Sequence, residues 1–162
     1  MVANPEKVTE TQMENWAKDF DSWDVCDQYC LNLFKKTKLA YPKAFEWSSR
    51  TELFVKRAGF VLMVCLVVSD KKAVNNQFIT FLPVIQREAG DNRNYVKKAV
   101  NWALRQIGKR NLHLNKETID TAKKIQKFDS RSARWIAADA IRELSSESVQ
   151  KRLHIKSKGS KF

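Results

Sequence analysis

Turn-forming residues are scarce in this sequence, which contains four Gly and three Pro among 162 residues. The glycines are too far apart to form a G-x-G-x-x-G or G-x-x-x-x-G-K-[ST] loop, so the usual nucleotide-binding fingerprints are excluded. Too few turn residues remain to connect many β-hairpins. We therefore expect a mostly helical chain that forms one domain and is long enough to bury a substantial core.

Helix-start signals and apolar periodicity divide the chain into helices joined by short polar connections. Thr9 with Gln12 forms a capping box, and Asn115 and Ser130 are expected to cap two later helices. The predicted helices cover residues 9–19, 23–37, 42–48, 50–69, 74–89, 94–109, 116–127, 131–145 and 148–155. This pattern favours either a helical bundle or an α-solenoid of stacked helix pairs. We expect a single domain over residues 1–155 and a basic, disordered tail over residues 156–162.

Positive charge is concentrated in the second half of the chain. Eleven Lys and Arg against ten Asp and Glu leave residues 1–81 at +1, whereas nineteen against eight leave residues 82–162 at +11. A helical domain with one strongly basic half is expected to bind a polyanion, and nucleic acid is the commonest candidate. The alternative is a solvated basic surface that serves solubility alone.

The sequence has three cysteines, no signal peptide and no N-x-[ST] site. This combination predicts a reducing, intracellular setting. Cys26 and Cys30 lie one helical turn apart with no His nearby, so we expect them in the core and predict no metal site. The most apolar run, residues 59–68, is too short to span a membrane and suits a buried helix.

The predicted helix 94–109 carries an aromatic residue on its polar face. Its apolar stripe consists of Val96, Val100, Ala103 and Ile107. Trp102 projects about 130° away from that stripe, on the same side as Lys98 and Arg105. An indole flanked by cations is well placed to contact a sugar or base beside phosphates. The alternative is a Trp covered by the next helix, with Lys side chains packed around it.

Two charged residues fall on apolar helix faces. Asp27 flanks the apolar face of the predicted helix 23–37, one turn after Trp23, where a carboxylate is costly unless another group pairs with it. Arg57 projects onto the apolar stripe of the predicted helix 50–69. We expect these side chains either to pair with each other, which would be purely structural, or to line one polar cleft together.

The predicted helix 131–145 repeats the basic and aromatic pattern more weakly. Arg131, Trp135 and Arg142 share one side, opposite a row of alanines and aliphatic residues. Asp139 lies among these cations and is expected to pair with them. We assign this helix to packing first and to nucleic-acid contact second.

Four runs of residues resemble the DNA alkylation repair enzyme family, the AlkD-like alkylpurine DNA glycosylases built from HEAT-like helical repeats. The runs are WDVCD at residues 23–27, FVKRAGF at 54–60, YVKKAVNWALR at 95–105 and SARWIA at 132–137. They occur in the family's order, and the similarity extends over roughly residues 16–144.

The resemblance implies an all-α fold, an α-solenoid of HEAT-like antiparallel helix pairs whose concave, basic face holds duplex DNA. It implies that Trp23, Asp27 and Trp102 face the damaged nucleotide and that Arg57 contacts the DNA backbone. Relatives that lack this Trp and Asp are thought to bind DNA without excising bases, so their presence favours activity. Family members usually carry several more helices before this Trp, which 22 residues precede here, so part of the DNA-holding surface is expected to be absent.

The reaction implied by the resemblance is hydrolysis of an N-glycosidic bond in base excision repair. A purine alkylated at N3 or N7 is cationic and leaves readily, and its loss produces an oxocarbenium-like sugar. An ionised Asp27 about 4 Å away would stabilise that charge by about 4 kcal/mol at an effective dielectric constant of about 20, or about three orders of magnitude in rate. The cations expected to contact phosphates are Lys97, Lys98, Arg105, Lys109 and Arg110. We expect a monomer that binds alkylated duplex DNA without a cofactor.

Two other functions are compatible with the same residues. A non-catalytic HEAT-like module would bind duplex or branched DNA in a salt-dependent way without releasing bases. A solenoid that binds an acidic protein would not bind duplex DNA even at low salt. Trp23 with Asp27 on one helix edge favours the glycosylase over both.

Overall fold

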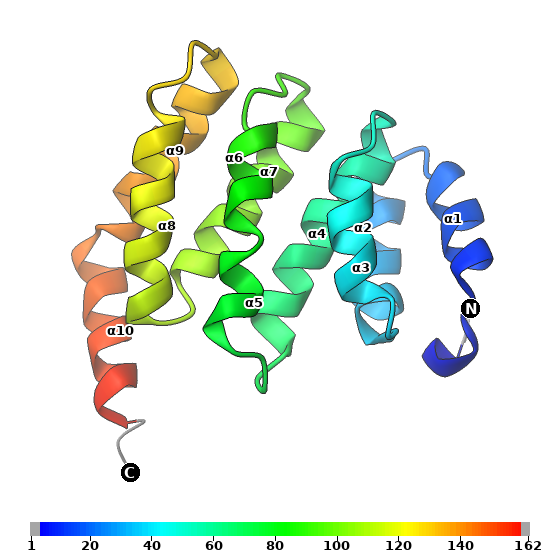
Figure 1. Cartoon of the computed structure of the whole chain (residues 1–162), viewed down its shortest axis with the longest axis horizontal. Coiled ribbons are helices and arrows are strands. Elements are labelled where there is room, and N and C mark those ends of the chain that lie inside the picture. The colour runs from blue at the N-terminus through cyan, green and yellow to red at the C-terminus, as the bar shows by residue number, and fades with distance from the viewer. Residues whose placement is uncertain (1–3, 160–162) are drawn as a thin grey trace.

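The computed structural model describes residues 4–159, and within this range every regular element is helical (Figure 1). The α-helices are α1 (Glu10–Lys18), α2 (Trp23–Asn32), α3 (Ala40–Ser48), α4 (Leu53–Ser69), α5 (Asn75–Ile79), α6 (Leu82–Glu88), α7 (Asn94–Gly108), α8 (Leu112–Ile125), α9 (Arg131–Leu144) and α10 (Glu147–Gly159). Two short 3₁₀ helices cover Pro5–Lys7 and Phe34–Lys36.

The helices stack as pairs in two layers. One layer contains α3, α5 with α6, and α8, and the other contains α2, α4, α7 and α9 (Figure 1). Helix α4 packs against α3 within its pair and against α2 and α7 within its layer, and α7 and α9 continue the row. The structure is therefore an α-solenoid of helix pairs rather than a bundle, which confirms the predicted fold class.

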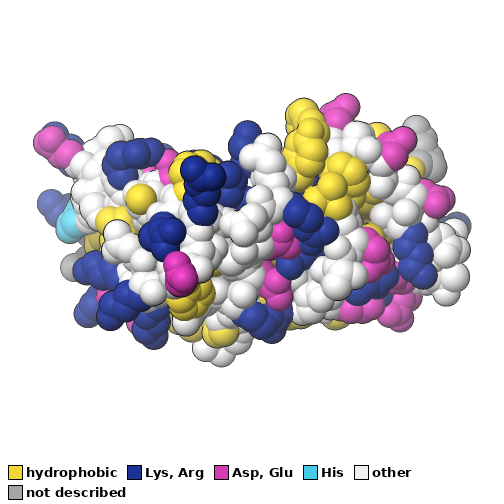
Figure 2. All heavy atoms as spheres, turned by 90° about the horizontal axis from the view of Figure 1, so that it is seen from above, with side chains coloured by type: hydrophobic (Ala, Val, Ile, Leu, Met, Phe, Trp, Pro, Cys, Tyr) yellow, Lys and Arg dark blue, Asp and Glu magenta, His cyan; other side chains and the backbone are white. Residues whose placement is uncertain are grey.

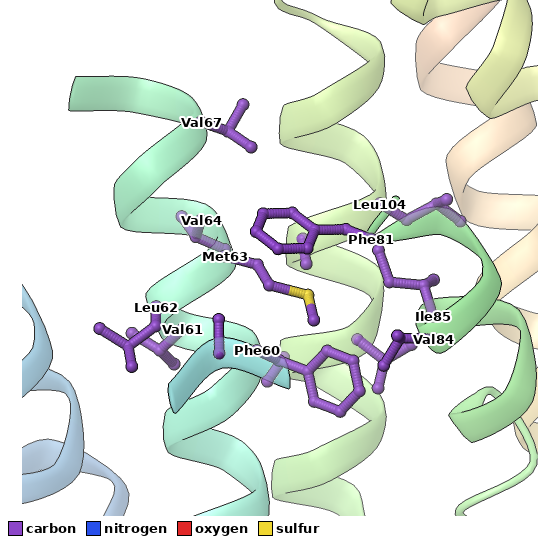
Figure 3. Close-up of a cluster of buried hydrophobic side chains, with 14 of the residues drawn as sticks. Phe60, Val61, Leu62, Met63, Val64, Val67, Phe81, Val84, Ile85 and Leu104 are labelled. Atoms are coloured by element: carbon purple, nitrogen blue, oxygen red, sulfur yellow. The ribbon is translucent and has the colours of Figure 1, made fainter. Parts of the chain in front are cut away.

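Helix α4 is the centre of the core. Every residue from Val55 to Val67 is buried, as expected for a helix that is apolar on all sides. Phe60 and Met63 point toward Phe81 and its neighbours on α6, while other apolar side chains of α4 point to the opposite side (Figure 3). Gly59 permits the close crossing of α4 over α3, because a Cβ atom there would lie 2.3 Å from the backbone nitrogen of Ser48.

The N-terminal helices are joined by an ionic cluster around one buried lysine. The Lys43 side chain is 1% exposed, and its Nζ is 2.9–3.2 Å from the carboxylates of Glu10, Glu14 and Glu46. Glu14 also accepts a hydrogen bond of 2.7 Å from Trp47 Nε1. Burial raises the pKa of Glu14, but hydrogen bonds from Trp47 and from neighbouring cations outweigh this effect and lower it to about 2. This cluster fixes α1 against α3.

Two predicted helices are interrupted in the structure. The predicted helix 23–37 ends at Asn32, because Leu33 leaves the helical region with φ −131° and ψ −60° before a 3₁₀ turn follows. The predicted helix 74–89 is divided into α5 and α6. Pro83 stands at the start of α6 and has no N–H to donate to the carbonyl four residues earlier, so one continuous helix cannot form.

The start of α8 and the end of α10 also differ from the prediction. Asn111, not Asn115, caps α8, and the side chain of Asn115 is buried and donates to the carbonyls of Gly108 and Leu144. Helix α10 extends to Gly159, so residues 156–159 are helical rather than part of a disordered tail; residues 160–162 lie outside the described range. Basic residues do not end a helix whose apolar residues, Val149 and Leu153, still pack on the core.

Other predictions are confirmed. The capping box of α1 and the Ser130 cap of α9 are both present. Cys26 and Cys30 are fully buried, as predicted for core residues, and burial raises the pKa of the Cys30 thiol. Among the described residues, no helix is both long enough and apolar enough to cross a membrane.

Candidate nucleic-acid interface

Asp27 and Arg57 form a buried ion pair between α2 and α4. Arg57 donates from Nε to Asp27 Oδ1 at 2.9 Å and from Nη2 to Oδ2 at 2.8 Å. The exposed fractions of Asp27 and Arg57 are 8% and 7%. The third guanidinium nitrogen, Nη1, donates to the Tyr95 carbonyl of α7 at 2.7 Å. Arg57 therefore links α2, α4 and α7, and of the two alternatives that the sequence left open, the structure shows the one in which the charged side chains pair with each other.

Arg57 also lines a hollow of about 420 Å³, which we call the tryptophan hollow. Its lining residues come from α4, α7 and α9 and are Arg57, Lys98, Asn101, Trp102, Arg105, Trp135 and Asp139. The structure thus brings Trp102 together with three of the predicted DNA-binding cations. Trp23 and Asp27 are not part of this lining, although Asp27 is bonded directly to Arg57.

Two polar atoms of the tryptophan hollow are unpaired. Asn101 is 2% exposed, and its Nδ2 donates to Asp139 Oδ2 at 2.8 Å, but its Oδ1 has no partner among the described residues. The buried Nε of Arg105 also lacks a hydrogen bond, since the nearest carboxylate oxygen of Asp139 is 3.8 Å away. Both atoms are buried beneath the surface of the hollow, where an unpaired polar atom is costly.

The predicted cations of α7 differ in how far the protein already neutralises them. Arg105 Nη1 and Lys109 Nζ each lie 2.9 Å from a different oxygen of Glu143 on α9. Burial raises the pKa of Glu143, but hydrogen bonds from Lys109 and Arg105 outweigh burial and lower it. Lys98 is exposed and makes no ion pair among the described residues, so its charge is the most accessible in the tryptophan hollow.

Lys97 and Arg110 do not line the tryptophan hollow. Lys97 Nζ lies 4.8 Å from the centre of the Trp135 ring, in cation–π geometry. Arg110 donates to the carbonyls of Val67, Asp70 and Ala73, so its guanidinium serves as a cap for the end of α4. Sequence projection does not reveal this role, because the three carbonyls lie about 40 residues earlier in the chain.

Trp23 is exposed because of its place at the start of α2. Ser22 caps the helix by accepting a hydrogen bond from Val25 N, and Trp23 is the first residue of the helix. The face of α2 that packs on α4 begins one turn later, at Cys26 and Asp27, which leaves 47% of the Trp23 surface exposed. An exposed indole one turn before a buried ion pair is a surface on which a base or sugar can stack.

Trp135 and Asp139 are residues of the hollow that helix projection assigned to packing or to local pairing, and Asn101 is a lining residue to which it assigned no role. The sequence signal for these residues is a four-residue spacing of polar side chains that recurs on α7 and on α9. Asn101 and Arg105 on α7 are four residues apart, as are Asp139 and Glu143 on α9, so the two rows face each other when the helices pack.

Charge is distributed unevenly along the solenoid. Lys and Arg side chains predominate over the C-terminal helices, at the left of Figure 2, and Asp and Glu side chains gather over the N-terminal helices at the right. The fold and the cation-lined, aromatic hollow are typical of a helical repeat protein that binds a polyanion.

The comparisons with known proteins define the family. The family model of the DNA alkylation repair enzyme matches residues 1–144, and the chain therefore belongs to that family. No curated protein sequence matches the chain. A solved structure described as "A new family of proteins related to the HEAT-like repeat DNA glycosylases with affinity for branched DNA structures" aligns with a TM-score of 0.65 and 14% sequence identity. The alignment covers 87% of this chain and 65% of that structure's chain, and it shows a shared fold.

Proposed function

We propose that this protein excises cationic N3- or N7-alkylated purines from duplex DNA. The observation that carries the proposal is the position of Arg57, which holds the carboxylate of Asp27 and at the same time lines the tryptophan hollow. This arrangement couples the candidate catalytic carboxylate to a site that offers an indole and an accessible cation. Family membership supports a role in the repair of alkylated DNA.

Binding is proposed to depend on phosphate contacts, with little reading of sequence. Lys98 is free to meet a phosphate, and Arg105 lines the same hollow with its Nη1 bonded to Glu143. Trp102 and Trp23 offer apolar ring surfaces on which a sugar or base can stack, worth about 1–3 kcal/mol per stacked base. The DNA backbone would then lie along α7, across the layer that contains α2 and α4.

The proposed chemistry needs one carboxylate and no strong acid, because the cationic purine is already a good leaving group. Arg57 orients Asp27, but its positive charge opposes the carboxylate's effect on the developing positive charge of the sugar. The contribution of Asp27 is therefore below the value of about 4 kcal/mol for a lone carboxylate about 4 Å away at an effective dielectric constant of about 20. Water directed by Asp27 would complete the hydrolysis.

A second candidate function is DNA binding without base excision. It is favoured by the two hydrogen bonds that occupy both oxygens of Asp27, and by the absence of Asp27 from the lining of the tryptophan hollow. The structural relative is described as having affinity for branched DNA structures. In this alternative the Asp27–Arg57 pair only joins helices, and the cations supply salt-dependent affinity for duplex or branched DNA.

The deciding experiment measures the release of N3- and N7-methylpurines from alkylated duplex DNA by chromatography. The wild type is compared with Asp27→Asn and with the matched control Asp24→Asn. Asp24 lies on the same helix, is exposed and makes no ion pair with any residue of the range 4–159, so its change removes one charge without touching the site. Thermal unfolding of each variant shows whether it is folded at the assay temperature.

We expect release by the wild type and by Asp24→Asn, and loss of release by a folded Asp27→Asn. Equal release by all three proteins contradicts the role of Asp27. DNA binding by the wild type with no base release supports the second candidate, and weaker binding by Lys98→Ala and Arg105→Ala would then locate it at the tryptophan hollow. Failure to bind duplex DNA at low salt contradicts the first function, and failure to bind both duplex and branched DNA contradicts both.

A further inference from the structure

A second hollow lies where the C-terminal ends of α4 and α7 meet the N-terminus of α8 and one side of α10. Its volume is about 810 Å³, and we call it the basic hollow. Five Lys and Arg residues line it, and no Asp or Glu does. They are Lys71, Lys109, Arg110, Arg152 and Lys156.

The protein neutralises only part of this charge. Arg110 is bonded to three carbonyls, Lys109 pairs with Glu143, and Lys156 donates to the Arg110 carbonyl. Lys71 and Arg152 are exposed and make no ion pair among the described residues. Two exposed cations thus line one concavity that has no carboxylate among its described lining residues, and a concave site with one sign of charge concentrates ions of the opposite sign.

The pKa of Lys156 is consistent with the same excess of positive charge. Burial is the largest cause that lowers its pKa, and repulsion from Lys71, Arg110 and Arg152 lowers it further. The N–H groups at the start of α8 add a small positive field from the same side, since Asn111 and Leu112 belong to the lining.

We propose that the basic hollow binds a phosphate group through Lys71 and Arg152. The phosphate belongs to the backbone of the DNA that occupies the tryptophan hollow. The identity of this ligand rests on the proposed function, whereas the phosphate site itself does not. Arg105 lines the tryptophan hollow and Lys109 lines the basic hollow, and both bind Glu143. They are one turn apart on α7, a rise of about 6 Å, and a DNA strand places a phosphate about every 3.4 Å along its axis. The two hollows are therefore adjacent along α7, and a DNA backbone that follows this helix past Arg105 reaches the edge of the basic hollow at Lys109.

The test compares Lys71→Gln/Arg152→Gln with the control Lys123→Gln/Lys158→Gln. Both double variants lose two positive charges, and all four side chains are exposed, but the control residues line neither hollow. Isothermal titration with tripolyphosphate in about 0.1 M salt, where the Debye length is about 10 Å, measures the phosphate site directly. The salt dependence of duplex DNA affinity measures whether DNA uses it.

We expect the site variant to lose at least about tenfold in tripolyphosphate affinity and the control to lose less than about twofold. We also expect the slope of log affinity against log salt to fall by about 0.9 in the site variant alone, the value for one lost phosphate contact. Loss of tripolyphosphate binding with an unchanged DNA slope supports the phosphate site and assigns it to a free phosphate ligand.

Equal behaviour of the two double variants, or no tripolyphosphate binding by the wild type, overturns the phosphate site. A wild type that neither binds DNA nor releases alkylated bases contradicts the proposed function. If the site variant alone still loses tripolyphosphate affinity, the phosphate site is supported independently. The two failures are therefore distinguishable.

Discussion

Removing Asp27 is expected to leave an uncompensated charge inside the protein. Arg57 is 7% exposed in the wild type, and in Asp27→Ala its Nε and Nη2 lose their acceptors, which leaves only the Tyr95 carbonyl bonded to Nη1. Breaking a buried ion pair by removing one partner costs about 3–5 kcal/mol. That loss is a large part of a total stability of about 5–15 kcal/mol.

The assay is urea unfolding followed by far-ultraviolet circular dichroism at neutral pH. The double variant Asp27→Leu/Arg57→Met removes both charges, and we expect it to recover most of the loss. Replacing a buried pair with apolar residues of similar volume is neutral or stabilising by about 1–4 kcal/mol in other proteins. The control Asp24→Ala removes an exposed first-turn carboxylate and is expected to cost less than about 1 kcal/mol.

Two results would refute this reasoning. A loss below about 1 kcal/mol in Asp27→Ala would mean that Arg57 finds solvent or another acceptor, contrary to its burial. A double variant as unstable as the single variant would mean that the helices depend on the pair itself rather than on charge compensation. Because the double variant also removes Arg57, which lines the tryptophan hollow, it tests stability alone, and Asp27→Asn tests base release.

Three further predictions concern packing, pH and binding. Gly59→Ala should lower the free energy of unfolding by about 1–3 kcal/mol, because its Cβ would lie 2.3 Å from Ser48 N, whereas Gly159→Ala meets no atom and should not destabilise. Since the pKa of Glu14 is lowered from 4.5 to about 2, its ionised form stabilises the fold above pH 4.5, and this stability is lost as the pH falls toward 2. Glu143→Gln should raise duplex DNA affinity about tenfold by releasing the two α7 cations that it binds.

Each of these predictions has a measurement that can contradict it. Equal unfolding midpoints in urea for the Gly59 and Gly159 variants would contradict the close crossing of α3 and α4. Acid unfolding is followed for the wild type and Glu14→Gln, and identical curves between pH 4.5 and 2 would show that Glu14 does not carry this dependence. Unchanged DNA affinity and salt slope in Glu143→Gln would mean that its cations do not meet phosphates.

Local signals in the sequence were sufficient for most helix positions. The Thr9–Gln12 capping box and the Ser130 cap were predicted correctly because each is a contact between residues three apart. The missed break before α6 also had a local signal, Pro83, whose missing N–H interrupts a helix. The Asn111 cap was harder to predict, because Asn111 and Asn115 are chemically identical and only tertiary contacts bury the second.

The sequence by itself determined that this chain is helical, that α4 is buried on all sides and that Asp27 and Arg57 need partners. These conclusions follow from properties of single helices, namely turn residues, periodicity and the cost of burying a charge. The tertiary structure decided which partners these residues have. It paired Asp27 with Arg57, assigned Arg110 to the end of α4 and gave Arg105 and Lys109 a shared carboxylate. All of these contacts join residues at least 30 positions apart, and only the stacking of one helix on the next brings such residues together.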